Sequence, residues 1–165
     1  IIRMKINVKY LPKRLSRKDK KTQSKMLMKS RRLYKKGKYY TRKAVPSFHS
    51  TKSPHIIKAI KIYNIDKIGA NSKLAKATGC SKSALAKIIN KGEGAYFSSG
   101  SRPNQTAQSW GIARLASSIT AGKAAAVDYN ILEKGCKSNS KALTMAKKAR
   151  KRFGYGTRKV SKVNI

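Results

Sequence analysis

The chain has 165 residues, of which 41 are lysine or arginine and only 5 are aspartate or glutamate, so its formal net charge is +36. Self-repulsion at such a charge destabilises a free compact domain and indicates an anionic partner: nucleic acid, an acidic protein surface or an anionic membrane surface. Five carboxylates and two histidines leave little material for general acid and base chemistry, so an enzyme is not expected.

Positive charge is concentrated at the two ends of the chain. Residues 1–45 carry 18 basic side chains and 1 acidic, and residues 141–165 carry 9 and none. A segment so charged and so poor in apolar residues cannot bury enough surface to offset the entropy of ordering its backbone. We therefore predict extended basic arms that only partners would order, with a basic N-terminal arm over 1–45, a helical central domain over 46–140 and a basic C-terminal helix and tail over 141–165.

Aromatic residues alternate with cations in the N-terminal arm, in the run Arg31-Arg32-Leu33-Tyr34-Lys35-Lys36-Gly37-Lys38-Tyr39-Tyr40. Basic side chains contact phosphate and tyrosines stack on bases, so the run suits nucleic acid. It suits an arm laid over a neighbouring protein equally well, because Tyr and Arg are favoured interface anchors. The candidate nucleic-acid contacts of this run are Arg31, Arg32, Lys35 and Lys36.

From about residue 53 onward, capping residues and apolar spacing predict a mainly α fold. The expected helices run from Pro54 to Tyr63, from Ser72 to Thr78, from Ser81 to Asn90 with Lys91-Gly92 as the stop, from Thr106 or Ser109 to Thr120, over residues 123–134, and from Ser140 through Phe153. Five cations crowd the end of the last helix, more than a helix C-terminus requires. They form a second group of candidate nucleic-acid contacts: Lys147, Lys148, Arg150, Lys151 and Arg152.

The segment from Leu74 to Ile89 resembles the helix-turn-helix of phage-repressor type. That motif needs a small residue where two helices touch, then a turn glycine, then two apolar residues, and the matching positions here are Ala75, Gly79, Leu85 and Ile88. The resemblance implies that an exposed recognition face approaches bases and phosphates, and the residues of that face are Ser81, Lys82, Ser83 and Lys87. A helical hairpin used only for packing is the alternative. The face lacks the Arg, Asn or Gln that usually reads base edges, so non-specific binding is expected.

A glycine- and serine-rich tract from Gly92 to Gln108 is expected to be an ordered structural loop between two helical halves. Its Arg102 and free backbone amides could instead cradle a phosphate before the next helix. A hydrolytic site could also be built from its serines with His49 or His55 and Asp128 or Glu133. Neither a Walker loop nor a nucleophile elbow is present, so both functional alternatives are weaker than the loop.

Neither a metal nor a cofactor is expected, because the two cysteines, Cys80 and Cys136, are far apart and belong to no CxxC pair. Two buried, reduced thiols are the simplest interpretation. No stretch approaches the roughly 18 to 20 apolar residues that span a bilayer, so a membrane span is not expected.

Three blocks of the sequence resemble a family of uncharacterised basic proteins encoded by nucleocytoplasmic large DNA viruses of algae and protists. The blocks are Tyr39-Tyr40-Thr41-Arg42-Lys43, Ser53-Pro54-His55-Ile56-Ile57-Lys58-Ala59, and Gly94-Ala95-Tyr96-Phe97-Ser98-Ser99-Gly100-Ser101-Arg102-Pro103-Asn104-Gln105-Thr106 with Ser109-Trp110-Gly111. The resemblance implies a minor capsid or internal virion protein that contacts capsid or other virion proteins, in the virion and, during assembly, in the host cytoplasm or viral factory. A DNA-binding protein for genome condensation or regulation is the alternative.

Overall fold

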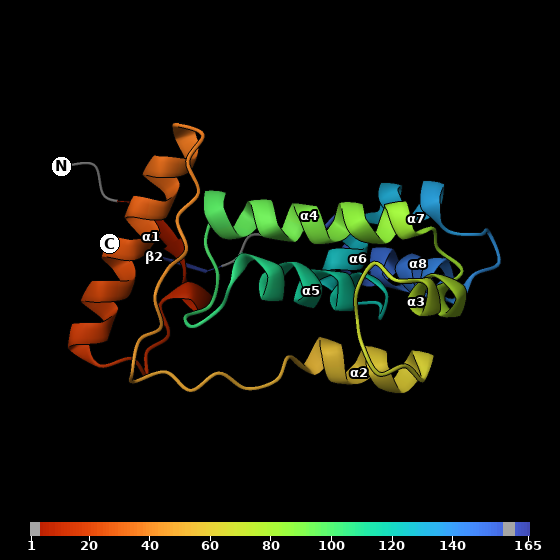
Figure 1. Cartoon of the computed structure of the whole chain (residues 1–165), viewed down its shortest axis with the longest axis horizontal. Coiled ribbons are helices and arrows are strands. Elements are labelled where there is room, and N and C mark those ends of the chain that lie inside the picture. The colour runs from red at the N-terminus through yellow and green to blue at the C-terminus, as the bar shows by residue number, and fades with distance from the viewer. Residues whose placement is uncertain (1–3, 157–160) are drawn as a thin grey trace. The chain divides into compact units, whose positions relative to one another are not determined.

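The computed structural model describes residues 4–156 and 161–165 and is mainly helical, as the sequence predicts (Figure 1). In chain order its elements are β1 Lys5–Asn7, a 3-10 helix Val8–Tyr10, α1 Arg17–Lys35, α2 Pro54–Tyr63, α3 Ser72–Thr78, α4 Lys82–Ser98, α5 Ala107–Ser118, α6 Lys123–Val127, α7 Tyr129–Gly135, α8 Lys141–Phe153 and β2 Lys162–Asn164. Within the described ranges, no helix is both long enough and apolar enough to cross a bilayer.

The described chain divides into two compact units. Unit 1 comprises residues 4–51, Glu93–Trp110 and 161–165, and unit 2 comprises Lys52–Gly92 and 111–156. Helices α4 and α5 therefore contribute residues to both units.

Unit 1 contains a helix, α1, where the sequence analysis predicts an extended arm. Its N-cap is Ser16, whose Oγ accepts a hydrogen bond from the backbone N–H of Asp19 at 3.1 Å. The buried residues of α1 recur at three- and four-residue steps along one face: Asp19, Gln23, Met26, Leu27 and Ser30. The prediction of an extended arm is therefore wrong for residues 17–35, because a narrow buried face, partly polar itself, is enough to hold this lysine-rich helix in place.

A small apolar cluster and the hydrogen bonds of Asn104 support α1. The buried members of the cluster are Leu15, Met26, Val45 and Phe48. Asn104 fixes the chain near Phe48, since its amide nitrogen donates to the carbonyls of Val45 and Phe48 at 3.2 and 2.7 Å and its Oδ1 accepts from the Val45 N–H at 2.7 Å.

The predicted C-terminal tail ends in β2, which pairs antiparallel with β1. Residues 157–160 of that tail, like residues 1–3 of the predicted arm, lie outside the described residues.

Unit 1 also encloses an arginine without a carboxylate partner. Arg42 is 6% exposed. Its Nη1 donates to Ser30 Oγ at 2.9 Å and to the Tyr96 carbonyl at 2.8 Å, and its Nη2 donates to Ser101 Oγ at 2.9 Å. The guanidinium carbon lies 3.8 Å from the centre of the Tyr96 ring. Burial lowers the pKa of Arg42, and neutral oxygens together with an aromatic face hold the charge.

Acid is expected to destabilise unit 1 through Asp19. The Ser47 side chain and its backbone N–H, which donates to Asp19 Oδ2 at 2.8 Å, lower the pKa of this carboxyl group. The unfolded chain therefore takes up the proton more readily, so this stabilisation is present above about pH 4 and is lost as the pH falls through the folded-state pKa. The midpoint temperature of thermal unfolding should fall between neutral and acidic pH, and Asp19→Asn should make this fall smaller. The control Asp66→Asn, at an exposed position, should show the same fall as the native chain. Equal pH profiles for the two variants would contradict the assignment of the effect to Asp19.

Unit 2 follows the sequence predictions in most of its helices. The predicted bounds of α2 and α3 match, and α8 ends at Phe153 with Ser140 as its N-cap. The fully buried large apolar residues of the unit are Leu74, Leu85, Ile88, Leu115, Ile119 and Leu132. Tyr63 is also buried among them, and burial raises the pKa of its hydroxyl, which donates to the Ile119 carbonyl.

Two predicted helix boundaries in this part of the chain are wrong. Helix α4 continues through Gly92 to Ser98 instead of stopping at Asn90, because Gly92 serves close packing: a Cβ there would lie 2.6 Å from the Cα of Gly111 in α5. The predicted loop is consequently shorter, and its first residues are helical. The predicted helix over 123–134 is divided into α6 and α7 at Asp128, whose φ of −96° and ψ of 16° leave the α-helical range.

Candidate nucleic-acid interface

The turn between α3 and α4 is built from capping residues and a left-handed glycine. Asn71 caps α3, Gly79 ends it with a φ of 76°, and Ser81 Oγ accepts the Ala84 N–H at 3.1 Å in the first turn of α4. The two apolar residues of the motif, Leu85 and Ile88, are fully buried, since both are 0% exposed.

The glycine of this turn also packs closely against another helix, α8. A Cβ on Gly79 would come within 2.7 Å of the Cβ of Ser140, the N-cap of α8, and the three atoms nearest to it all belong to Ser140. The tightest packing at this glycine is therefore against the start of α8.

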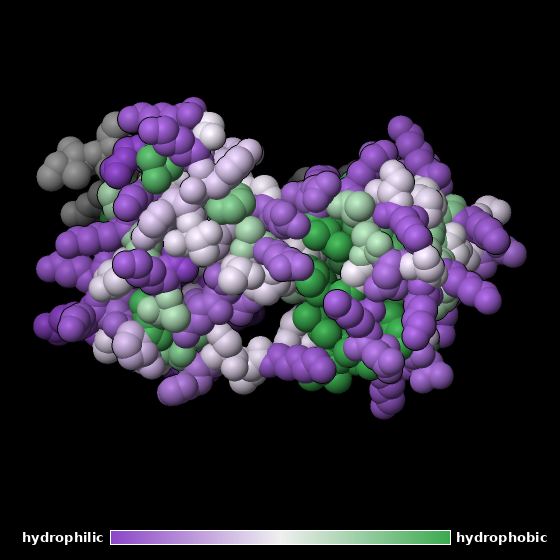
Figure 2. All heavy atoms as spheres, in the orientation of Figure 1, coloured by the Kyte–Doolittle hydropathy of each residue, from purple (hydrophilic) through white to green (hydrophobic). Residues whose placement is uncertain are grey.

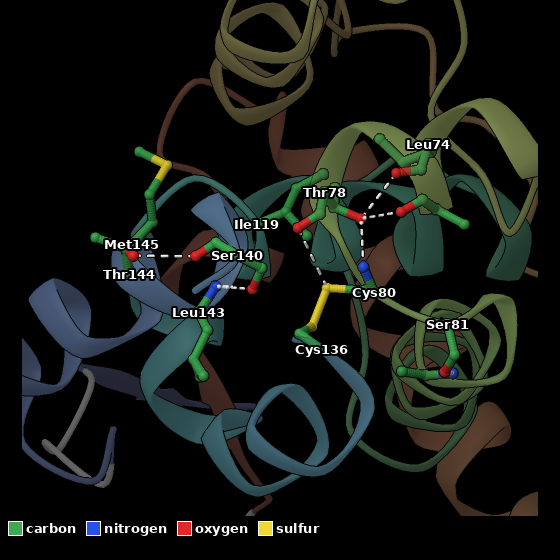
Figure 3. The surroundings of a disulfide bond; sticks show 12 residues. Leu74, Thr78, Cys80, Ser81, Ile119, Cys136, Ser140, Leu143, Thr144 and Met145 are labelled. Atoms are coloured by element: carbon green, nitrogen blue, oxygen red, sulfur yellow. Dashed lines mark hydrogen bonds between the residues drawn. A yellow bond between two sulfur atoms is a disulfide. The ribbon is translucent and has the colours of Figure 1, made fainter. Parts of the chain in front are cut away.

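A disulfide joins this turn to the end of α7 (Figure 3). Cys80 and Cys136 form an antiparallel bridge. On one side of it the Ser81 N–H donates to the Gly135 carbonyl at 2.8 Å, and on the other the Lys137 N–H donates to the Gly79 carbonyl at 2.9 Å. Both cysteines are buried, as predicted, but the expectation of reduced thiols is wrong: the fold brings together two residues separated by 56 positions, which sequence spacing does not reveal.

An open recess of about 340 Å³ lies between α4 and α7. Its polar lining residues are Ser81, Ser83, Lys87, Asn130 and Lys134. Two ammonium groups, two hydroxyls and an amide can all donate hydrogen bonds to phosphate oxygens, and no carboxylate lines the recess. The chemistry of the recess therefore suits a phosphate group.

Three of the four predicted recognition-face residues line this recess, and the fourth, Lys82, is exposed at the first residue of α4. The sequence analysis missed Asn130 and Lys134, because they join the site only through the tertiary packing of α7 beside α4. No local signal marks them. Gly135 lies against Ala84, where a Cβ on the glycine would overlap it, so α7 packs beside the first turn of α4. Ser81, Ser83 and Lys87 thus line the wall of a recess, whereas a recognition helix presents such residues on a free helix face.

A second basic surface of unit 2 lies on α8. Its buried residues are Ala142, Leu143, Ala146 and Ala149. Four of the five predicted cations are exposed, namely Lys147, Lys148, Lys151 and Arg152. Arg150 differs, because its guanidinium lies 4.3 Å from the ring centre of Tyr129 and 4.9 Å from that of Tyr155. Figure 2 shows hydrophilic side chains projecting from both units on the visible face.

The predicted contact residues of unit 1 fall into two groups, exposed side chains and one side chain that is hydrogen-bonded within the fold. Arg32, Lys35 and Lys36 are exposed at the end of α1, and Arg102 is exposed in the loop before α5. Arg31 is committed within the fold: its Nε donates to the Ser99 carbonyl at 2.8 Å and its Nη1 to that of Lys5 at 3.1 Å, and burial lowers its pKa.

Few of the cations meet an acid. The two ion pairs found among the described residues both end on the buried Asp128, from Lys91 at 3.2 Å and from Arg114 at 2.7 Å. In the same described ranges, no group of three or more His, Cys, Asp or Glu residues is placed to hold a metal ion. Asp128, one of the carboxylates considered for hydrolysis, is thus occupied by a structural role.

Comparison with known proteins gives one match. DUF5824, a family of unknown function, matches residues 8–139, which include every helix from α1 to α7. No curated protein matches the chain, and neither does any solved structure. Because the family match covers well over half of the sequence, the chain belongs to the DUF5824 family.

Proposed function

We propose that this protein binds nucleic acid through phosphate contacts, without enzymatic activity, as a structural component of a large DNA virus particle. The observation that carries the proposal is the recess of unit 2, where Lys87 and Lys134 face one cavity with three uncharged donors and no carboxylate. A polymeric anion also offsets a net charge of +36 better than a small ligand does.

The binding is expected to be independent of base sequence. Recognition of a base in the major groove usually relies on Arg, Asn or Gln with access to its edge, and α4 presents Ser83 and Lys87 inside the recess. The exposed cations of α8 add phosphate contacts of the same kind. Genome condensation inside the particle is the role that matches such contacts.

The virion setting rests on the sequence resemblance to basic proteins of large DNA viruses. Capsid and other virion proteins would then be the neighbours of this chain. Mass spectrometry of purified particles, with ultraviolet cross-linking of protein to genome, tests this setting separately from the binding chemistry.

Removal of the two recess lysines tests the binding site. Lys87→Ala with Lys134→Ala is expected to weaken binding to duplexes of unrelated sequence alike, and to reduce the slope of log affinity against log salt by about 1 per lysine. The matched control is Lys58→Ala with Lys61→Ala, which removes the same charge from exposed positions on α2. Equal losses for the two pairs would show that the recess is not a site, and no binding by the native protein at low salt would reject the function.

A further inference from the structure

The end of α1 places two tyrosines side by side. Gly37, with a φ of 73°, reverses the chain: its N–H donates to the Tyr34 carbonyl at 2.9 Å, and the next N–H, of Lys38, donates to the Leu33 carbonyl at 2.9 Å. This is the Schellman arrangement, which needs a residue that tolerates the left-handed region. Tyr39 thereby returns to α1, with its ring centre 6.2 Å from that of Tyr34.

A third ring completes the group from α4. The centre of the Phe97 ring lies 5.0 Å from that of Tyr39, and Phe97 in turn packs edge-on against the buried Tyr96 at 5.1 Å. We call Tyr34, Tyr39 and Phe97 the aromatic platform. Two helix ends of unit 1 hold it, so its rings are positioned before any ligand arrives.

Two of the three rings of the aromatic platform are exposed to solvent, and Phe97 is partly buried. Tyr39 is 72% exposed and Tyr34 39% exposed, although neighbours on both sides fix the Tyr39 ring. Unit 1 does not use these rings to complete its buried apolar cluster. A positioned but uncovered group of rings is a surface that a partner can cover.

The charges beside the platform favour one class of partner. Residues 31–40 hold five cations and no acid, and the exposed cations among them are Arg32, Lys35, Lys36 and Lys38. A strand of nucleic acid supplies both complements, phosphates for the cations and flat bases for the rings. A duplex keeps its base faces within its own stack, whereas an unpaired strand exposes them.

We infer that the aromatic platform stacks unpaired bases and gives the protein a preference for single-stranded nucleic acid. The inference rests on the proposed function and adds a strand preference to it. Base stacking on aromatic side chains contributes about 5- to 150-fold in affinity per base. The cations of the same segment hold the backbone of the bound strand.

The test compares Tyr39→Leu with Tyr155→Leu in the full chain. Both tyrosines are 72% exposed, so neither change disturbs a core, and Tyr155 lies in unit 2 beside Arg150. Fluorescence anisotropy would measure binding to an oligothymidine strand and to a duplex of equal length. Tyr39→Leu should weaken oligothymidine binding about fivefold or more and leave duplex binding and its salt slope unchanged, Tyr39→Phe should bind like the native chain, and Tyr155→Leu should have no effect.

The possible failures are distinguishable. If Tyr39→Leu leaves the affinity for oligothymidine unchanged, or lowers the affinities for oligothymidine and duplex equally, the platform does not stack bases and the inference is overturned. The proposed function still holds in either case if the native chain binds the duplex. If the native chain binds neither ligand at low salt, the proposed function fails and the inference with it.

Discussion

Replacement of Asp128 with alanine is expected to lower the free energy of unfolding of unit 2 by about 3 kcal/mol, as removal of one partner from a buried ion pair does. The Asp128 side chain is fully buried. It accepts hydrogen bonds from Arg114 Nε at 2.9 Å, from Arg114 Nη2 at 2.7 Å and from Ser118 Oγ at 3.1 Å. Its loss leaves the donors of Arg114 and Ser118 without their acceptor. The effect lies at the lower end of the usual range because Arg114 and Lys91 retain access to water.

Urea unfolding followed by circular dichroism would measure this loss. Glu133→Ala is the matched control, since it removes the same charge from an exposed position on α7. Asp128→Asn keeps the shape and one acceptor, so its stability should lie between those of the native chain and Asp128→Ala. If Asp128→Ala and Glu133→Ala unfold at the same urea concentration, the buried carboxylate does not stabilise unit 2.

Reduction of the Cys80–Cys136 disulfide is expected to destabilise unit 2 by about 4 kcal/mol. The bond closes a loop of 56 positions, and the chain-entropy model gives about 3 kcal/mol for a 15-residue loop and about 4.7 kcal/mol for a 100-residue one. The proposed nucleic-acid binding should weaken as well, because the bond fixes the end of α7, which carries Lys134, to the turn before α4.

Thermal unfolding with and without dithiothreitol measures the effect of the bond. The variant Cys80→Ser with Cys136→Ser serves as the control, since it should already unfold at the lower temperature and should not respond to the reductant. Thiol titration of the denatured, unreduced protein should find no free thiol. Two titratable thiols per chain would show that the cysteines are not joined.

Elements marked by local signals were predictable from the sequence. Helices α2, α3 and α8 have a capping residue at one end and apolar residues at helical spacing, and both signals act within a few residues. Helix α1 was missed because its buried face includes Asp19, Gln23 and Ser30, which composition counts as polar. Their burial depends on partners far along the chain, such as Ser47 for Asp19 and Phe97 for Ser30.

Of the two helices that line the candidate site, only the residues of α4 were predictable from the sequence. Ser83 and Lys87 follow from the exposed face of a helix whose other face is apolar. Lys134 and Asn130 enter through tertiary packing of α7 beside α4, which no spacing in the sequence encodes. The end predicted for α4 at Gly92 was wrong for a related reason, since glycine serves there as a contact surface for α5 and not as a helix stop.

The environment of Arg42 affects how the protein should respond to salt. An ion pair loses strength as salt is added, but Arg42 is held by two hydroxyls, a carbonyl and an aromatic ring, which are neutral, so screening has little to weaken inside unit 1. The same ions relieve the mutual repulsion of the exposed cations, which stabilises the folded chain. On the proposed function, they also displace the protein from the phosphates of its ligand. Rising ionic strength therefore favours the fold while it releases the ligand, and the free protein should remain folded under the conditions that strip it from nucleic acid.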